Sequence, residues 1–154
     1  MKAKVESKLP DLRQAKDHDC GPTAVRIILK YHKRSVTKTH IKELPCDPVD
    51  GTDPRAIESW FRSRDLGVLA GTMTWQDLRH LTGQGRPVIC LITTSHGIGH
   101  YVVVSHTFGG YITYQCPTNG LLKVSKKEWL RGWHEVDRLG AKYIQWGIAV
   151  HRLQ

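Results

Sequence analysis

The spacing of apolar residues predicts helices in the first half of the chain. Apolar residues recur with helical periodicity over residues 23–31, and Pro22 is typical of a first helical position. Asp53 followed by Pro54 predicts the start of another helix, because Asp is a favoured N-cap and Pro fits the next position. That helix is expected to end near Gly67. Two shorter helices are expected over residues 35–43 and 74–80.

The pattern changes in the second half, where short β-branched and alternating runs predict strands. Gly109-Gly110 is typical of a hairpin turn, and Ser125 with Glu128 has the pattern of a helix capping box. Because helices come first and an antiparallel sheet follows, the sequence predicts an α+β fold. The predicted strands cover residues 87–93, 100–106, 111–116, 121–124 and 142–153.

Length and composition predict one globular domain. The 154 residues are enough to bury a substantial core, and 40% hydrophobic with 24% charged residues is typical of a folded chain. Residues 1–12 are polar and are expected to form a flexible arm before a single domain over 13–154. The sequence shows neither a membrane-spanning apolar run nor a signal peptide. We therefore expect a cytoplasmic protein whose four cysteines are free thiols.

The net charge of +9 is compatible with an acidic partner such as nucleic acid or an anionic surface. The basic residues are scattered, however, and no zinc, helix-turn-helix or RNA-binding signature directs them. A solvated basic surface is the simpler interpretation. Nucleic-acid binding is therefore not expected.

Cys20 stands immediately before the first predicted helix, in the run Asp-Cys-Gly-Pro. The dipole and free N–H groups of a helix N-terminus lower a thiol pKa and favour the thiolate, which is the nucleophile of cysteine acyl transfer. The alternative is a cysteine that packs passively in a capping loop. Of the other cysteines, Cys90 is expected to be a buried apolar residue, and Cys46 carries no clear signal.

A thiolate nucleophile also needs a base, and His100 is the best placed of the nine histidines. It follows a glycine-rich loop and opens a predicted strand, so that its ring can project from a sheet edge into a cleft. His96, in the same loop, is interpreted as a solvent-exposed residue, and His106 as a structural one.

Together these residues resemble the bacteriocin-processing peptidases, papain-like cysteine peptidases that cut leader peptides after a double glycine. The resemblance covers roughly residues 12–118 and rests on the order and spacing of several motifs. Gln14 precedes Cys20 by six residues, Gly-Arg-Pro-Val-Ile stands at 85–89, and Gly-His-Tyr-Val-Val-Val stands at 99–104. The resemblance implies a papain-like α+β fold with N-terminal helices packed on an antiparallel sheet. It also suggests a free-standing bacterial or phage relative of these domains.

Carried over position by position, the resemblance implies that Cys20 is the nucleophile and His100 the base that also protonates the leaving amine. Gln14 would donate its side-chain amide to the oxyanion hole, where loss of one donor costs about 10²–10³ in turnover. One position departs from the family, because Cys116 stands where an Asp usually orients the imidazole. A thiol is a weak acceptor and is mostly neutral near pH 7, so backbone carbonyls or Asn119 could hold the ring instead.

We therefore expect a cysteine peptidase that hydrolyses an amide bond of a peptide or protein substrate, after Gly-Gly if the resemblance holds. A related amidase or another thiol acyl-transfer enzyme stays open, because papain-like folds support several reactions. A further alternative is a catalytically weakened domain that binds a peptide or protein partner without cutting it. Cys20 and Cys116 on either side of one histidine also suggest a sulfenate or disulfide under oxidation. No cofactor or metal is implied, because the cysteine spacing matches no zinc site.

Overall fold

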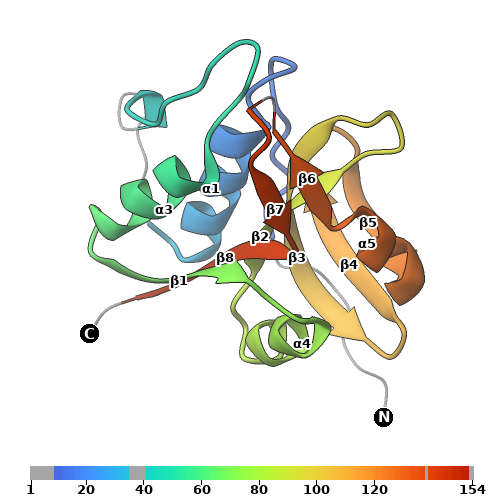
Figure 1. Ribbon diagram of the computed structural model, residues 1–154. Coiled ribbons are helices and arrows are strands. Elements are labelled where there is room, and N and C mark those ends of the chain that lie inside the picture. The colour runs from blue at the N-terminus through green and yellow to red at the C-terminus, as the bar shows by residue number, and fades with distance from the viewer. Residues whose placement is uncertain (1–8, 35–40, 138, 153–154) are drawn as a thin grey trace.

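The computed structural model describes residues 9–34, 41–137 and 139–152 and has an α+β fold (Figure 1). Its helices are α1 (Cys20–Tyr31), α3 (Pro54–Arg62), α4 (Trp75–Gly83) and α5 (Lys126–Gly132). Its strands are β1 (Leu66–Thr72), β2 (Val88–Thr93), β3 (Gly99–Phe108), β4 (Tyr111–Cys116), β5 (Gly120–Ser125), β6 (His134–Val136), β7 (Lys142–Ile144) and β8 (Trp146–Arg152). An antiparallel sheet has the order β1-β8-β2-β3-β4-β5, and β6 pairs with β7 in a separate ribbon.

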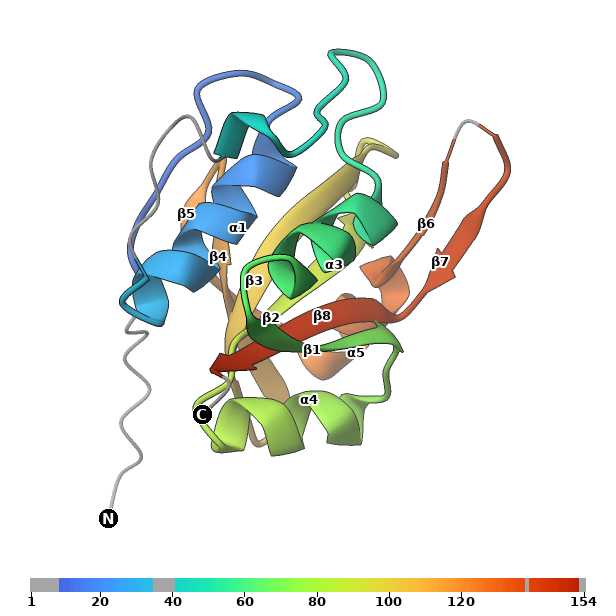
Figure 2. The same ribbon diagram turned by 90° about the vertical axis from the view of Figure 1, so that its left-hand side faces the viewer.

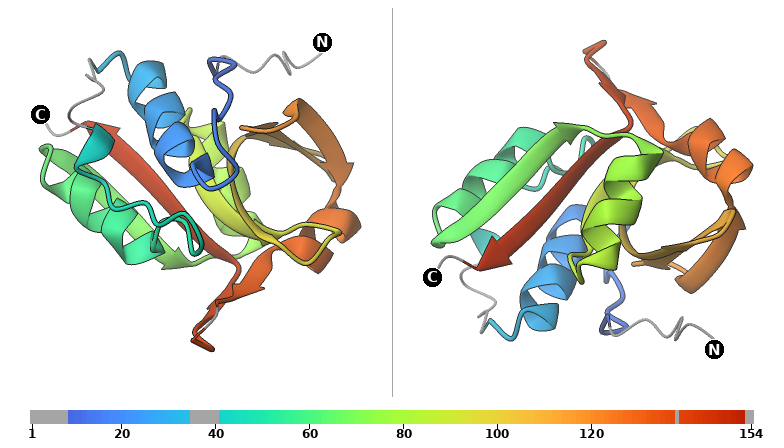
Figure 3. Two further views of the ribbon diagram at one scale, coloured as in Figure 1. Left: turned by 90° about the horizontal axis from the view of Figure 1, so that it is seen from above. Right: turned by 90° about the horizontal axis from the view of Figure 1, so that it is seen from below.

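The sheet is buried on both faces, which explains the continuous apolar runs of its central strands. In β2, Ile89 and Leu91 pack into one core with α1 and α3. Val88 and Cys90 point to the other face and pack into a second core with α4 and α5. The views from the side and from above show α1 and α3 on one face of the sheet and α4 on the other (Figure 2; Figure 3). The active-site candidates on α1 and β3 are therefore held between packed layers.

Capping contacts confirm three of the predicted helix starts. The Asp53 side chain accepts a hydrogen bond from the Arg55 backbone N–H at 2.8 Å. Thr74 and Asp77 form a reciprocal capping box at the start of α4, and Ser125 caps α5. Each contact satisfies a backbone N–H that the first turn of a helix leaves without a partner.

Other boundaries differ from the prediction. α1 begins earlier than expected, so that Cys20 lies inside its first turn and Pro22 is not the first helical residue. α3 ends at Arg62, well before Gly67, because Leu66 begins the unpredicted strand β1. The last predicted strand is divided in two at Gln145, where a φ of 50° interrupts the extended backbone.

The segment just before the predicted domain packs against it. Leu9 is 8% exposed and belongs to the core beneath α1 and α3. The Asp11 carboxylate accepts a hydrogen bond from the Gln115 side chain at 2.8 Å. The flexible arm predicted over residues 1–12 is therefore wrong for residues 9–12. Residues 1–8 lie outside the described residues, as do residues 35–40 of the helix predicted over 35–43.

Candidate active site

Cys20 is the first residue of α1, and the turn that contains it is closed by Asp19. The Asp19 carbonyl accepts hydrogen bonds from the backbone N–H and the hydroxyl of Thr23, at 3.1 and 2.8 Å. Gly21 follows and lies against Thr52, so that a Cβ at position 21 would stand 2.9 Å from the Thr52 Cβ. Glycine at this position therefore lets the start of α1 approach the loop before α3 more closely than another residue would.

Burial dominates the electrostatics of the Cys20 thiol. The residue is 9% exposed, and desolvation raises its pKa to about 11. Hydrogen bonds from the backbone N–H groups of Tyr101, Gly21 and Cys20 itself oppose this rise, and the nearby Cys46 thiol adds to it. The N–H groups at the helix N-terminus therefore lower this pKa as predicted, but burial outweighs them and the net shift is upward. The free-energy cost of burying a thiolate exceeds the stabilisation that these N–H groups provide.

His100 and Cys116 meet across the neighbouring strands β3 and β4. The His100 Nε2 lies 3.2 Å from the Cys116 Sγ, and Cys116 is 4% exposed. Burial also lowers the pKa of the His100 imidazole. The ring therefore contacts the thiol that was expected to be a poor acceptor, whereas Asn119, which was expected to hold the ring instead, lines the same cleft.

The backbone of β3 connects the two halves of the site. The Cys20 sulfur accepts a hydrogen bond from the backbone N–H of Tyr101, the residue that follows His100. The sulfur therefore lies against the peptide unit that joins His100 to Tyr101. Cys20, His100 and Cys116 are thus brought to one place although they are distant in the sequence.

Gln14 joins the same site through three hydrogen bonds. Its backbone N–H donates to the carbonyl of Pro117, the residue that follows Cys116, at 2.9 Å. Its Oε1 accepts from the Thr118 hydroxyl at 3.0 Å, and its Nε2 donates to the Lys16 carbonyl at 2.7 Å. These contacts fix the plane of the amide. Since an amide nitrogen carries two N–H groups, the bond to Lys16 uses only one of them.

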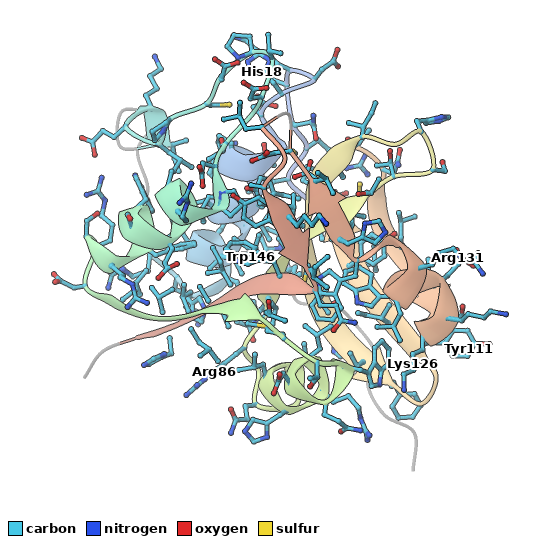
Figure 4. All side chains as sticks on the ribbon, in the orientation of Figure 1. His18, Arg86, Tyr111, Lys126, Arg131 and Trp146 are labelled. Atoms are coloured by element: carbon cyan, nitrogen blue, oxygen red, sulfur yellow. The ribbon has the colours of Figure 1, made fainter. Side chains whose placement is uncertain are left out.

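A cleft of about 1240 Å³ opens beside these residues. Gln14, His100 and Cys116 line it, whereas Cys20 is buried and is not part of its lining. The cleft is large enough for several residues of an extended peptide. Arg131, which extends from α5 in Figure 4, is one of its charged residues. The others are Arg13, Lys16, Asp17 and Glu128.

Among the remaining sulfur and imidazole candidates, His96 lines the same cleft and Cys46 lies near Cys20. Cys90 is fully buried in β2, as predicted, and His96 is exposed. The Cys46 thiol donates to the His18 carbonyl at 3.2 Å, and His18 stands at the top of Figure 4. The His106 ring is half-buried and contacts the neighbouring serine hydroxyl. All four cysteines are free thiols.

Two negative findings apply to the part of the chain that the structure describes. Within it, no group of three His, Cys, Asp or Glu side chains is arranged to hold a metal ion. Within the same ranges, no helix combines the length and the apolar composition needed to span a bilayer.

Sequence reasoning missed Thr52, Tyr101 and Glu135. The Tyr101 hydroxyl donates to the Thr52 carbonyl at 2.6 Å, and this buried bond ties β3 to the loop before α3. The Glu135 carboxylate occupies the space that a side chain at Gly99 would fill. Burial, with a smaller effect of Asp137, raises the Glu135 pKa. Only Tyr101, an aromatic residue beside the predicted base, had a sequence signal that could have drawn attention to it.

The peptidase C39 family matches residues 8–137. The pediocin PA-1 transport/processing ATP-binding protein PedD of Pediococcus acidilactici is 23% identical over 146 residues, which are 86% of this chain but 18% of that protein. The chain thus spans less than a fifth of the length of this curated relative.

Two solved structures share the fold. A double glycine motif protease from an AMS/PCAT transporter, in complex with the leader peptide, has a TM-score of 0.74 at 18% identity, covering 96% of this chain and 94% of its own. The peptidase domain of Streptococcus ComA has a TM-score of 0.70 at 18% identity, covering 96% of this chain and 100% of its own. These similarities confirm the predicted papain-like α+β fold.

Proposed function

Because this chain belongs to the peptidase C39 family, we propose that it is a cysteine peptidase in which Cys20 attacks the scissile carbonyl and His100 transfers the proton. One observation carries the assignment of the residues. The Cys20 sulfur is bound to the Tyr101 N–H, next to His100, whose Nε2 contacts Cys116. This order of thiol, imidazole and third group supports a nucleophile, a base and a group that orients the base.

In this proposal, Cys20 and His100 are both uncharged before substrate binds. Burial raises the Cys20 pKa and lowers the His100 pKa, and both shifts disfavour a thiolate beside an imidazolium. Proton transfer from the thiol to His100 then accompanies attack on the substrate. Because Nε2 faces Cys116, Nδ1 is the nitrogen that receives this proton.

The later steps use the same residues. The Gln14 amide and the Cys20 backbone N–H stabilise the oxyanion of the tetrahedral intermediate. His100 returns its proton to the leaving amine, and a thioester forms on Cys20. A water molecule, activated by the neutral His100, hydrolyses the thioester and restores the thiol.

The substrate that we propose is a peptide segment cut after Gly-Gly. The similar AMS/PCAT protease is described as a double glycine motif protease and was solved with a leader peptide. The cleft of about 1240 Å³ beside His100 supports binding of an extended chain.

A quenched fluorescent peptide with a single Gly-Gly pair tests this function. We expect the parent protein to cut after the second glycine and Cys20→Ala to be inactive, because it lacks the nucleophile. Cys46→Ala is the matched control, since it makes the same change to a thiol that donates to the His18 carbonyl and has no role in the proposed reaction. Circular dichroism of each variant verifies the fold. Equal cleavage by Cys20→Ala and the parent would contradict the proposal.

A domain that binds peptide without cutting it is the second candidate. The contact of His100 with Cys116 favours it, because a thiol is a weaker hydrogen-bond acceptor for the imidazolium than a carboxylate is. Calorimetric titration with the same Gly-Gly peptide separates the two functions. Saturable binding by the parent without any cleaved product after long incubation supports the binding domain.

A further inference from the structure

Cys116 is the cysteine that both lines the cleft and contacts the proposed base. Its Sγ lies 3.2 Å from the His100 Nε2. When His100 takes a proton, its ring becomes positively charged, and the group facing Nε2 should accept a hydrogen bond and carry negative charge. A neutral thiol is a weak hydrogen-bond acceptor and carries no negative charge.

A guanidinium, that of Arg13, lies near Cys116. The pKa of Arg13 is raised chiefly by its hydrogen bond to Asp11, and negative charge on Cys116 raises it further. Arg13 also donates to the Thr118 carbonyl at 3.4 Å, which keeps the guanidinium near the end of β4. A negative group at residue 116 would therefore have a guanidinium nearby and an imidazole in direct contact.

We propose that Cys116 is an oxidation site, at which a hydroperoxide converts the thiol to a sulfinate that then supports His100 as a carboxylate would. The inference rests on the proposed function. A sulfinate carries two oxygens on the atom attached to Cβ, as the carboxylate of Asp does. It therefore presents anionic acceptors to Nε2 from the same backbone position. Oxidation would raise the activity of this peptidase instead of abolishing it.

The conversion consumes two molecules of hydrogen peroxide for each thiol. In the first step the sulfur attacks a peroxide oxygen, the O–O bond breaks, and a sulfenic acid and one water form. The sulfenic sulfur attacks a second peroxide in the same way, which gives the sulfinic acid and another water. Sulfur loses two electrons in each step, and each peroxide is reduced by two. The sulfinic proton then passes to solvent and leaves the anion.

Cys116 is expected to react before Cys20. Cys116 lines the cleft that admits the peroxide, and its Sγ lies 3.2 Å from the His100 Nε2. Burial keeps the Cys20 thiol protonated, with a pKa of about 11, and Cys20 does not line the cleft that admits the peroxide.

The test treats the parent protein with a limited dose of hydrogen peroxide, removes the excess with catalase, and locates oxidation by peptide mass spectrometry. We expect Cys116 to gain two oxygen atoms while Cys20 stays reduced. Alkylation of Cys20 by iodoacetamide at neutral pH should then accelerate about tenfold or more, because an anion close to a base raises its pKa by about 1–3 units. Cleavage of the Gly-Gly peptide should rise in parallel.

Two variants test whether the faster alkylation of Cys20 comes from negative charge at residue 116. Cys116→Ala has no thiol to oxidise, so peroxide should not accelerate Cys20 alkylation. Cys116→Asp carries a permanent carboxylate and should show the fast alkylation without peroxide. If Cys116→Asp does not fold, the parent protein before and after peroxide still decides the question.

Three results would overturn the inference: oxidation of Cys20 ahead of Cys116, a Cys20–Cys116 disulfide, or a Cys116 sulfinate that leaves Cys20 alkylation unchanged. Each of these leaves the proposed function standing if Cys116→Asp accelerates alkylation. If neither the sulfinate nor a folded Cys116→Asp changes the reactivity of Cys20, His100 does not act on Cys20, and the proposed function fails as well.

Discussion

The Tyr101 hydroxyl donates a buried hydrogen bond to the backbone carbonyl of Thr52, 2.6 Å away. Tyr101 follows the proposed base on β3, and Thr52 packs against Gly21, which follows the proposed nucleophile. This single bond therefore links the strand that carries His100 to the loop that contacts the start of α1. A buried acceptor that loses its donor also lacks water, so the link should matter for stability.

Tyr101→Phe should lower the free energy of unfolding by about 1–3 kcal/mol, because it leaves the Thr52 carbonyl buried without its donor. Urea denaturation at neutral pH measures the change. Tyr111→Phe is the control, because Tyr111 is half exposed and a surface change of this kind shifts stability by about 0.5 kcal/mol or less. Equal unfolding midpoints for the two variants would show that the Tyr101 hydroxyl contributes nothing to stability.

Gly21→Ala should both destabilise the protein and reduce cleavage. The new Cβ would stand 2.9 Å from the Thr52 Cβ and 3.0 Å from its Oγ1, so α1 or the loop must shift. Overpacking of this kind costs about 1–3 kcal/mol, and here it also moves Cys20. Thermal unfolding and the rate of peptide cleavage report the two effects.

Gly83→Ala is the matched control for that substitution. A Cβ at Gly83, the last residue of α4, meets nothing within 4 Å. Because Ala is a better helix former, this variant should be as stable as the parent or more stable, by up to about 1 kcal/mol. Unimpaired cleavage by Gly21→Ala would mean that the position of Cys20 tolerates the shift.

Features with local causes were predictable from the sequence. The capping pattern of Thr74 and Asp77 acts within one turn, and it correctly located the start of α4. β1 was missed because its stability comes from pairing with β8, which lies far away in the sequence, near the C-terminus. Glycines at 67 and 71 also weaken its strand pattern. The division of the final strand at Gln145 was also missed, because no glycine or proline stands at that position to predict a break.

In the candidate site, too, the residues were predictable from local sequence, whereas the properties that depend on tertiary packing were not. Residue type and position indicated Cys20 and His100, and the structure brings Cys20 against the backbone of the residue that follows His100. The direction of the Cys20 pKa shift was wrong because it depends on how deeply distant segments bury the thiol. The contact between Glu135 and Gly99 depends on the ribbon of β6 and β7, whose position follows from tertiary packing.

Gln14→Ala should lower turnover of the Gly-Gly peptide by about 10²–10³ with little change in fold, because it removes an oxyanion donor. Thr118→Val is a graded comparison. It removes the hydroxyl that donates to the Gln14 Oε1 at 3.0 Å but keeps the amide itself, so the loss should be smaller. Steady-state kinetics measure both variants. A Gln14→Ala enzyme with unchanged turnover would exclude the amide from the oxyanion hole.

Cys20 should also make the fold sensitive to alkaline pH. Its pKa in the folded protein is about 11, raised by burial from an ordinary value of 9.0. As the pH rises, the unfolded chain therefore releases this proton first, and the folded state holds more protons between these two values. Stability consequently falls with rising pH over this window, and the contribution is fully present below pH 9. A difference of this size corresponds to about 2–3 kcal/mol.

Urea unfolding of the parent and of Cys20→Ala at several pH values between about 8 and 11 checks this dependence. The free energy of unfolding should decline more steeply with pH in the parent, because Cys20→Ala has no thiol to titrate. Some decline should persist in the variant, since burial also raises the pKa values of Cys90 and Tyr101. Parallel curves for the two proteins would mean that the Cys20 thiol ionises equally readily in the folded and unfolded states, so that burial does not raise its pKa. A parent that gains stability relative to Cys20→Ala as the pH rises would indicate the lowered pKa expected at a helix N-terminus.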